Sequence, residues 1–93
     1  MSAATIPPSR DEILALVRDQ LAEILEVEPT SIAEDATFTQ LGADSLALIE
    51  LVEAIEENLT ARVGDFRIDD EDLEGLESVR SAVDYVTAKL SPA

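Results

Sequence analysis

The sequence contains neither cysteine nor histidine in its 93 residues. Their absence removes thiol nucleophiles, disulfides, most zinc sites and the commonest general base of enzymes. Only three glycines are present (Gly42, Gly64 and Gly75), so there is no glycine-rich phosphate loop. These absences exclude a catalytic triad with histidine and a thiol site.

Aromatic residues are also scarce, at 3% of the chain, and tryptophan is absent. Apolar residues nevertheless make up 46% of the sequence, enough for a folded core rather than a disordered chain. That core must be built mainly from Ala, Leu, Ile and Val, which suits packed helices better than a sheet sandwich. The length allows one small domain.

Positive charge is scarce as well. The chain has 6 Lys and Arg residues against 21 Asp and Glu residues, which gives a net charge of −15. A field of this sign repels nucleic acid backbones and anionic lipid surfaces, and it attracts basic patches on other proteins. The sequence shows no basic leader followed by an apolar stretch and no run of membrane-spanning length. We therefore expect a cytoplasmic, monomeric protein that binds neither nucleic acid nor membranes.

The first helix is predicted to begin after a flexible arm over residues 1–8, and residues 9–91 are predicted to form the domain. Ser9 is a candidate N-cap, and Glu12, three residues later, completes a capping box. Proline disfavours the helical region for the residue before it, so Glu28–Pro29 is the expected end of the helix. Its apolar stripe, recurring at helical spacing, is Ile13, Val17, Leu21 and Ile24.

A long connection over residues 30–43 is predicted next, and a second helix from Asp44 to Leu59. The connection contains Ile32, Phe38 and Leu41, which suggests that it lies over the core. Asp44 is a candidate N-cap for the second helix. Its apolar face is expected to comprise Leu46, Ile49, Leu51, Val52, Ile55 and Leu59, and its acidic face Glu50, Glu53, Glu56 and Glu57.

A short helix is predicted at the acidic run 69–72, and a last helix is predicted to begin at Ser78. Acidic residues are favourable at a helix N-terminus. The apolar stripe of the last helix is Val79, Ala82, Val83, Val86 and Leu90. The fold class is therefore all-α: a small four-helix bundle of three main helices and one short one, with a long loop between helices 1 and 2.

Two acidic patterns in the sequence bear on metal binding or catalysis. The many paired carboxylates lie on helix faces that we expect to be solvated. The run that starts at Asp70 resembles the first half of a calcium-binding loop, but its twelfth position is Ser81, where a bidentate glutamate is needed. We expect no metal site.

Ser45 is predicted to be the first residue of the second helix, directly after a loop. Backbone N–H groups at a helix start are free, and the positive end of the helix dipole favours a phosphate group there. However, Ser9 and Ser78 are predicted to occupy similar positions. Position alone therefore does not select Ser45.

The residues around Ser45 resemble the second helix of acyl carrier proteins, the phosphopantetheine-binding carrier family. The resemblance rests on residues 41–46 (LGADSL), 49–52 (IELV) and 54–57 (AIEE), and it extends through residues 32–38, 68–72 and 78–86 in the same order. It thus covers nearly the whole chain after residue 12.

This resemblance implies that Ser45 carries 4'-phosphopantetheine, added from coenzyme A by a phosphopantetheinyl transferase. The thiol of the arm holds acyl groups as thioesters for acyl-loading, condensing and acyl-transfer enzymes of fatty acid, polyketide or lipopeptide biosynthesis. It also implies that the protein is a carrier and not an enzyme, and that the bundle can shelter the cargo between its helices. Residues that match family contacts to basic docking patches are Asp44, Leu46, Glu50, Glu53, Glu56, Glu57, Asp70 and Glu71.

Three departures from the family pattern favour a carrier of a specialised polyketide or lipopeptide pathway. Ala47 stands where an acid is frequent, Glu53 stands where an apolar residue is common, and residues 60–67 form a longer stretch than in compact fatty acid carriers. Two alternatives remain open. One is a peptidyl or aminoacyl carrier with the same arm, and the other is an unmodified acidic helical interaction module that does not need Ser45.

Overall fold

In the computed structural model, which describes residues 8–90, helix α1 (Arg10–Leu25) begins at a complete capping box. The Ser9 hydroxyl accepts a hydrogen bond from the Glu12 backbone N–H at 3.2 Å. The Glu12 carboxylate in turn accepts one from the Ser9 backbone N–H at 2.8 Å. This reciprocal pair confirms the predicted start of the first helix.

Helix α1 ends earlier than the predicted boundary at Glu28–Pro29. Glu26 adopts a left-handed conformation with φ of 59°, and the Val27 N–H donates to the Ala22 carbonyl at 3.0 Å. This is the hydrogen bond of a Schellman-type helix end. The proline therefore does not stop α1 but opens a separate 3₁₀ helix, η1 (Pro29–Ser31).

The connection between α1 and α2 lies over the core, as predicted, with Ile32 and Phe38 buried. Backbone hydrogen bonds also hold it to the start of the last helix. The Phe38 N–H donates to the Glu77 carbonyl at 3.0 Å, and the Val79 N–H donates to the Ala36 carbonyl at 3.0 Å. The connection is thus held in place both by its buried side chains and by backbone hydrogen bonds to the start of α3.

Helix α2 (Ser45–Val63) begins where the sequence predicts and runs past the predicted end at Leu59. The Asp44 carboxylate accepts a hydrogen bond from the Ala47 N–H at 2.8 Å, which confirms Asp44 as the N-cap. The helix stops at Gly64, whose φ of 95° is open to glycine but strained for other residues.

The predicted apolar face of α2 is wrong at two positions. Leu51, Ile55 and Leu59 are fully buried, but Leu46 is 63% exposed and Ile49 is 44% exposed. Successive residues of an α-helix are rotated by about 100°, so Ile49 lies about 200° from Leu51 and points outward. Their apolar character predicts a core position for both residues, but their angular position on the helix decides their exposure.

Between α2 and α3, where a short helix is predicted at residues 69–72, the chain forms a 3₁₀ helix, η2 (Asp70–Gly75). The Tyr85 hydroxyl donates to the Asp72 carboxylate at 2.6 Å and ties η2 to the last helix. Burial, together with this hydrogen bond, raises the pKa of Tyr85 to about 12. The hydroxyl is therefore a donor across the physiological pH range.

Helix α3 (Val79–Leu90) begins one residue after Ser78, the predicted start and cap candidate. The Ser78 hydroxyl accepts a hydrogen bond from the Ser81 N–H at 3.1 Å, the pattern of an N-cap. The predicted stripe is confirmed for the four residues that the structure buries: Val79, Ala82, Val83 and Val86.

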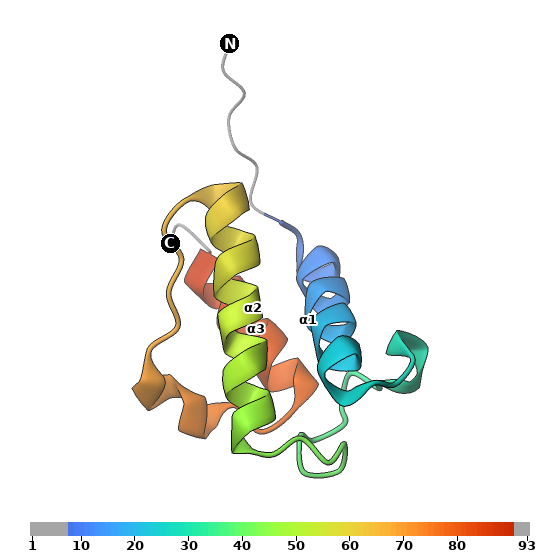
Figure 1. The fold of residues 1–93 in the computed structure, drawn as a ribbon. Coiled ribbons are helices and arrows are strands. Elements are labelled where there is room, and N and C mark those ends of the chain that lie inside the picture. Colours follow the sequence, from blue (N-terminus) through green and yellow to red (C-terminus); the bar gives the residue numbers. More distant parts are fainter. Residues whose placement is uncertain (1–7, 91–93) are drawn as a thin grey trace.

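The described residues form three α-helices and no strand, which confirms an all-α fold. Helices α1 and α2 run side by side in opposite directions, and α3 packs behind them (Figure 1). Both α2 and α3 contact α1. The buried aliphatic core between them is closed by side chains from the connections: Ile32, Phe38, Phe66, Ile68 and Leu76.

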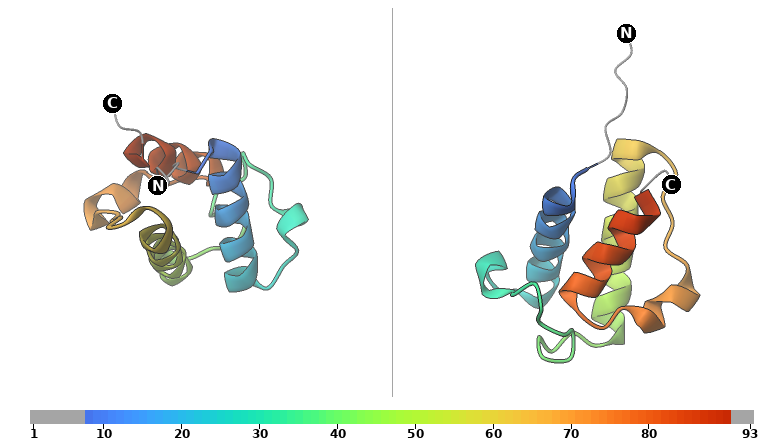
Figure 2. Two further views of the ribbon diagram at one scale, coloured as in Figure 1. Left: turned by 90° about the horizontal axis from the view of Figure 1, so that it is seen from above. Right: turned by 180° about the vertical axis from the view of Figure 1, so that it is seen from behind.

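The first residues of α2 lie at one end of the molecule. The α1–α2 connection, η2 and the start of α3 gather at the same end, the lower one in Figure 1 and in the right-hand view of Figure 2. Ser45, the first residue of α2, therefore lies near segments that are far apart in the sequence.

Some expectations concern residues outside the described range. The predicted arm over residues 1–8 lies outside it except for Pro8, which is buried, and the predicted domain end at Ser91 lies outside it too. Within residues 8–90, no helix is both long enough and apolar enough to cross a membrane.

Candidate functional site

A tight turn fixes the place where the loop ends and α2 begins at Ser45. Gly42 adopts a positive φ of 78°, and the Ala43 N–H donates to the Phe38 carbonyl at 2.9 Å. The turn leads into Asp44, which is extended and caps α2. The backbone at Ser45 is thus held by the cap on one side and by the helix on the other.

The Ser45 side chain is exposed, and its hydroxyl makes no hydrogen bond to any described residue. The Ala47 N–H is already bonded to Asp44, whereas the N–H groups of Ser45 and Leu46 have no partner in the described part of the chain. Free N–H groups and the positive helix end favour a negatively charged group here. An accessible hydroxyl beside free N–H groups at a helix start is a suitable position for a phosphate-linked group.

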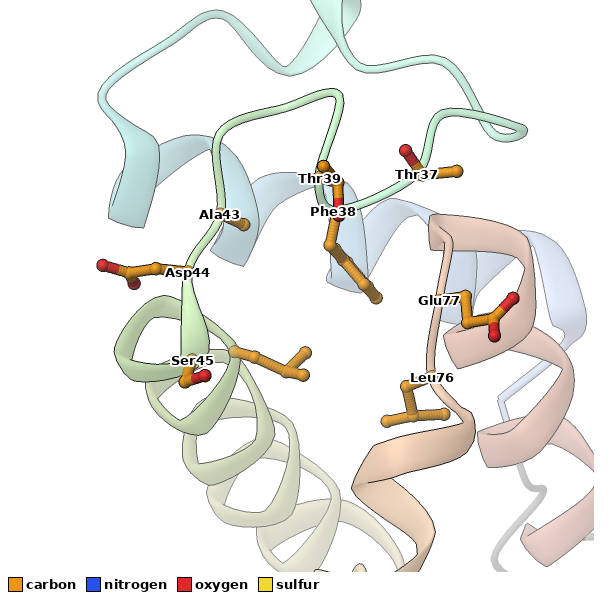
Figure 3. A pocket seen from close by; sticks show the side chains of 9 residues that line it. Thr37, Phe38, Thr39, Ala43, Asp44, Ser45, Leu76 and Glu77 are labelled. Atoms are coloured by element: carbon orange, nitrogen blue, oxygen red, sulfur yellow. The ribbon is translucent and has the colours of Figure 1, made fainter.

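Ser45 lines the edge of a hollow of about 540 Å³ (Figure 3). The side chains of Phe38 and Leu76 point into this space, whereas the Asp44 carboxylate points away from it. The hollow lies between the N-terminal turn of α2, the α1–α2 connection and the segment that leads into α3. Its lining residues are Thr37, Phe38, Thr39, Ala43, Asp44, Ser45, Leu48, Leu76 and Glu77.

A second, smaller hollow of about 230 Å³ also reaches Ser45, on the side of η2. It is lined by Leu48, Ile49, Leu73 and Glu74 in addition to the serine. Leu48 lines both hollows. Ser45 therefore has two adjacent recesses, one with a mixed polar and apolar lining and one that is mainly apolar.

Beside Ser45, the outer surface of α2 carries an apolar patch followed by acids. Leu46 and Ile49 form the exposed apolar patch, and Glu50, Glu53 and Glu57 are exposed further along the helix. None of these three carboxylates forms an ion pair with a described residue. This surface is free to meet a positively charged partner.

Glu56 differs from the other acids predicted to contact partners. Its side chain is half-buried, and its carboxylate accepts a hydrogen bond from the Ile68 N–H at 2.7 Å. This bond holds the segment before η2 against α2. Glu56 therefore serves the fold in this structure.

The acids predicted on the short helix have different surroundings. Glu71 is exposed, whereas the Asp70 side chain lies outside the described part of the structure. Within the described residues, no group of three or more acidic side chains is arranged to hold a metal ion.

Three arginines are held on the side of the molecule formed by α1, α3 and the connection. Arg10 lies 2.7 Å from Glu34 and 2.8 Å from Asp84, and Arg80 lies 3.3 Å from Glu34. Arg18 donates to the Ile32 carbonyl at 2.9 Å. Hydrogen bonds from the arginines lower the pKa of Glu34. These three arginines therefore bind to groups on this side of the molecule and do not form ion pairs with the exposed acids of α2.

The structure brings Asp44, Ser45 and Leu46 together, with Glu50 and Glu53 farther along the same helix. Sequence reasoning missed Ile49 as an exposed residue, and it missed the hollow altogether. Helical periodicity counted from the buried positions could have placed Ile49 outside. Nothing in the sequence signals that residues 37–39 and 76–77 form one recess.

Comparison with known families identifies a match that spans the site. A family model described as a phosphopantetheine attachment site matches residues 15–86, well over half of the chain. The matched range includes Ser45 and every residue that lines the two hollows beside it.

Proposed function

This chain belongs to the phosphopantetheine attachment-site family, and from that premise we propose that it is an acyl carrier protein with its prosthetic arm on Ser45. Domains of this family carry a covalently attached 4'-phosphopantetheine and are generally carriers rather than catalysts. They interact with phosphopantetheinyl transferases and with biosynthetic enzymes.

The observation that carries this proposal is the environment of Ser45. Its hydroxyl is exposed and unbonded among the described residues, at the positive end of a helix of 19 residues. On attachment, the Ser45 oxygen bonds to the phosphorus of the phosphopantetheinyl group of coenzyme A. The adenosine bisphosphate part leaves, and a base of the transferase takes the hydroxyl proton. The residues present fit the group, because the free N–H groups favour the phosphate and the hollow offers room beside it.

Incubation with a transferase and coenzyme A tests the attachment. We expect one phosphopantetheine on the wild type and none on Ser45→Ala, with Ser31→Ala, another exposed serine, loading normally. A wild type that stays unmodified although folded and initially free of the arm would favour the unmodified acidic interaction module.

For partner docking, we propose that the patch of Leu46 and Ile49 and the acids Glu50, Glu53 and Glu57 face basic surfaces of partner enzymes. Charge complementarity raises association rates, and salt screens it. Glu50→Lys should therefore slow transfer by partner enzymes. Glu23→Lys, an exposed acid on α1, is the matched control for the change in net charge. Equal effects of the two reversals, or a wild-type rate independent of salt, would remove the proposed docking surface.

For the cargo, we propose an acyl group rather than an amino acid. The smaller hollow beside Ser45 is lined by three aliphatic residues, Leu48, Ile49 and Leu73, together with Glu74, and this mainly apolar lining suits an acyl chain. Offering the loaded protein acyl donors and aminoacyl donors in parallel tests this choice. Preferential aminoacylation would favour the peptidyl carrier.

We further propose a specialised polyketide or lipopeptide pathway for this carrier. Ala47 is only 8% exposed, so an acid at this position, frequent in the family, would be partly buried here. Partners that require that acid would not recognise this chain. If Ala47→Asp leaves the fold intact and reaction with fatty acid synthesis enzymes stays unchanged and efficient, this assignment is wrong.

A further inference from the structure

Glu34, in the α1–α2 connection, binds two helices at once. Its carboxylate accepts hydrogen bonds from Arg10 on α1 at 2.7 Å and from Arg80 on α3 at 3.3 Å. Its backbone carbonyl also accepts a hydrogen bond from the Arg80 N–H at 2.8 Å. The Glu34 side chain is only 26% exposed, so water and salt screen these ion pairs less than they screen fully exposed pairs. Glu34 therefore joins the connection to both helices.

A short ladder of backbone hydrogen bonds continues from Glu34 along the connection. It joins residues 36–38 to residues 77–79 through two further bonds of 3.0 Å, from the Val79 N–H to the Ala36 carbonyl and from the Phe38 N–H to the Glu77 carbonyl. A two-stranded ladder as short as this is marginally stable by itself. The charged hydrogen bonds of Glu34 at its end therefore help to hold the connection in place against the start of α3.

The ladder reaches the turn before Ser45 through Phe38. The Phe38 N–H is bonded to the segment that leads into α3, and the Phe38 carbonyl accepts a hydrogen bond from the Ala43 N–H at 2.9 Å. Ala43 is followed directly by Asp44, the N-cap of α2. The place of the first turn of α2 therefore depends on how the connection lies against residues 77–80.

We propose that Glu34 is a positioning residue for the attachment of phosphopantetheine to Ser45, an inference that rests on the proposed function. Glu34 acts through the connection, which holds the turn over residues 42–44 in the arrangement that a transferase meets. Without the carboxylate, the turn adopts other arrangements as well, and only the fraction in the native arrangement is ready to bind. The KM of the transferase for the carrier then rises in inverse proportion to that fraction, whereas kcat of the bound complex stays the same.

Asp84 offers a matched control, because it binds the same arginine as Glu34. It is an exposed acid on α3 that lies 2.8 Å from Arg10, and it has no hydrogen bond to the connection among the described residues. Glu34→Ala and Asp84→Ala each remove one negative charge and one ion pair of Arg10, but only Glu34→Ala releases the connection. An effect of net charge or of overall stability would therefore appear in both variants.

Two readouts on the folded, unmodified variants test the proposal. With a transferase and excess coenzyme A, we expect Glu34→Ala to raise the KM for the carrier by about 2- to 30-fold, the usual range for coupling through connected contacts, with kcat unchanged. In nitrogen–proton correlation spectra, the amide signals of residues 43–46 should move in Glu34→Ala. Asp84→Ala should change neither the KM nor these signals. Glu34→Gln keeps one acceptor oxygen and should lie between the wild type and Glu34→Ala.

The inference has outcomes that overturn it while the proposed function stands. These are equal changes in the two alanine variants, a wild-type KM in Glu34→Ala, and a raised KM without any movement of the amide signals of residues 43–46. If Glu34→Ala does not fold, Glu34→Gln and Asp84→Asn are compared by the same two readouts, and the same results decide. Absence of transfer to the folded wild type would instead refute the proposed function, and this inference with it.

Discussion

Replacing Glu56 by alanine should destabilise the protein, because the Ile68 N–H would lose its partner. That N–H donates to the Glu56 carboxylate at 2.7 Å, and Ile68 is 6% exposed, so water has little access to the vacated group. An unsatisfied buried donor costs about 1–3 kcal/mol. For a domain of this size, each kcal/mol lowers the melting temperature by about 4–8 °C.

Thermal unfolding followed by circular dichroism measures this effect. Glu57→Ala is the matched control, because it removes the same charge from an exposed neighbouring position and should change the stability by less than about 0.5 kcal/mol. Glu56→Gln keeps an acceptor and should retain most of the stability. If Glu56→Ala and Glu57→Ala melt at the same temperature, the structural role of Glu56 is refuted.

Three further predictions concern stability and ionisation. Tyr85, the only tyrosine, should ionise near pH 12 in an ultraviolet titration. Asp72→Asn should lower that pKa, because it removes the carboxylate that accepts the hydrogen bond. The same titration midpoint in both proteins would mean that the hydrogen bond has no influence on the pKa. Because the pKa of Glu34 is lowered in the folded state, its contribution to stability is complete above the ordinary carboxylate value of 4.5 and is lost as the pH falls through the lowered value. Chemical unfolding should therefore show that the advantage of the wild type over Glu34→Gln disappears in acid, and a constant difference across pH would contradict this. Asp44→Ala should cost about 1 kcal/mol through loss of the N-cap, measured by the same unfolding assay, and no loss would mean that the cap contributes nothing.

The helix starts could be predicted from the sequence because capping is local. Ser9 with Glu12, Asp44 and Ser78 each hydrogen bond to a backbone N–H three residues later. Such short-range bonds depend on residue type and spacing alone. The helix ends were harder, since Glu26 is a left-handed residue that is not glycine and gives no signal in the sequence.

The candidate site could be predicted only in part, because some of its features are local in the sequence and others depend on contacts between distant segments. Ser45 could be proposed as the attachment residue because it lies in a contiguous sequence pattern. The bond from Ile68 to Glu56 depends instead on a contact between segments that are distant in the sequence. The hollow likewise depends on the hydrogen bond between Phe38 and Glu77. Residue types alone do not encode these contacts.

Mapping the modified residue is the most direct test of the central claim. After incubation with a phosphopantetheinyl transferase and coenzyme A, cleavage after arginine yields a single peptide from Asp19 to Arg62 that contains two serines, Ser31 and Ser45. Fragmentation of this peptide in a mass spectrometer distinguishes them. The account predicts one phosphopantetheine, on Ser45. Modification of another serine, or of none in a folded protein that did not already carry the arm, would contradict it.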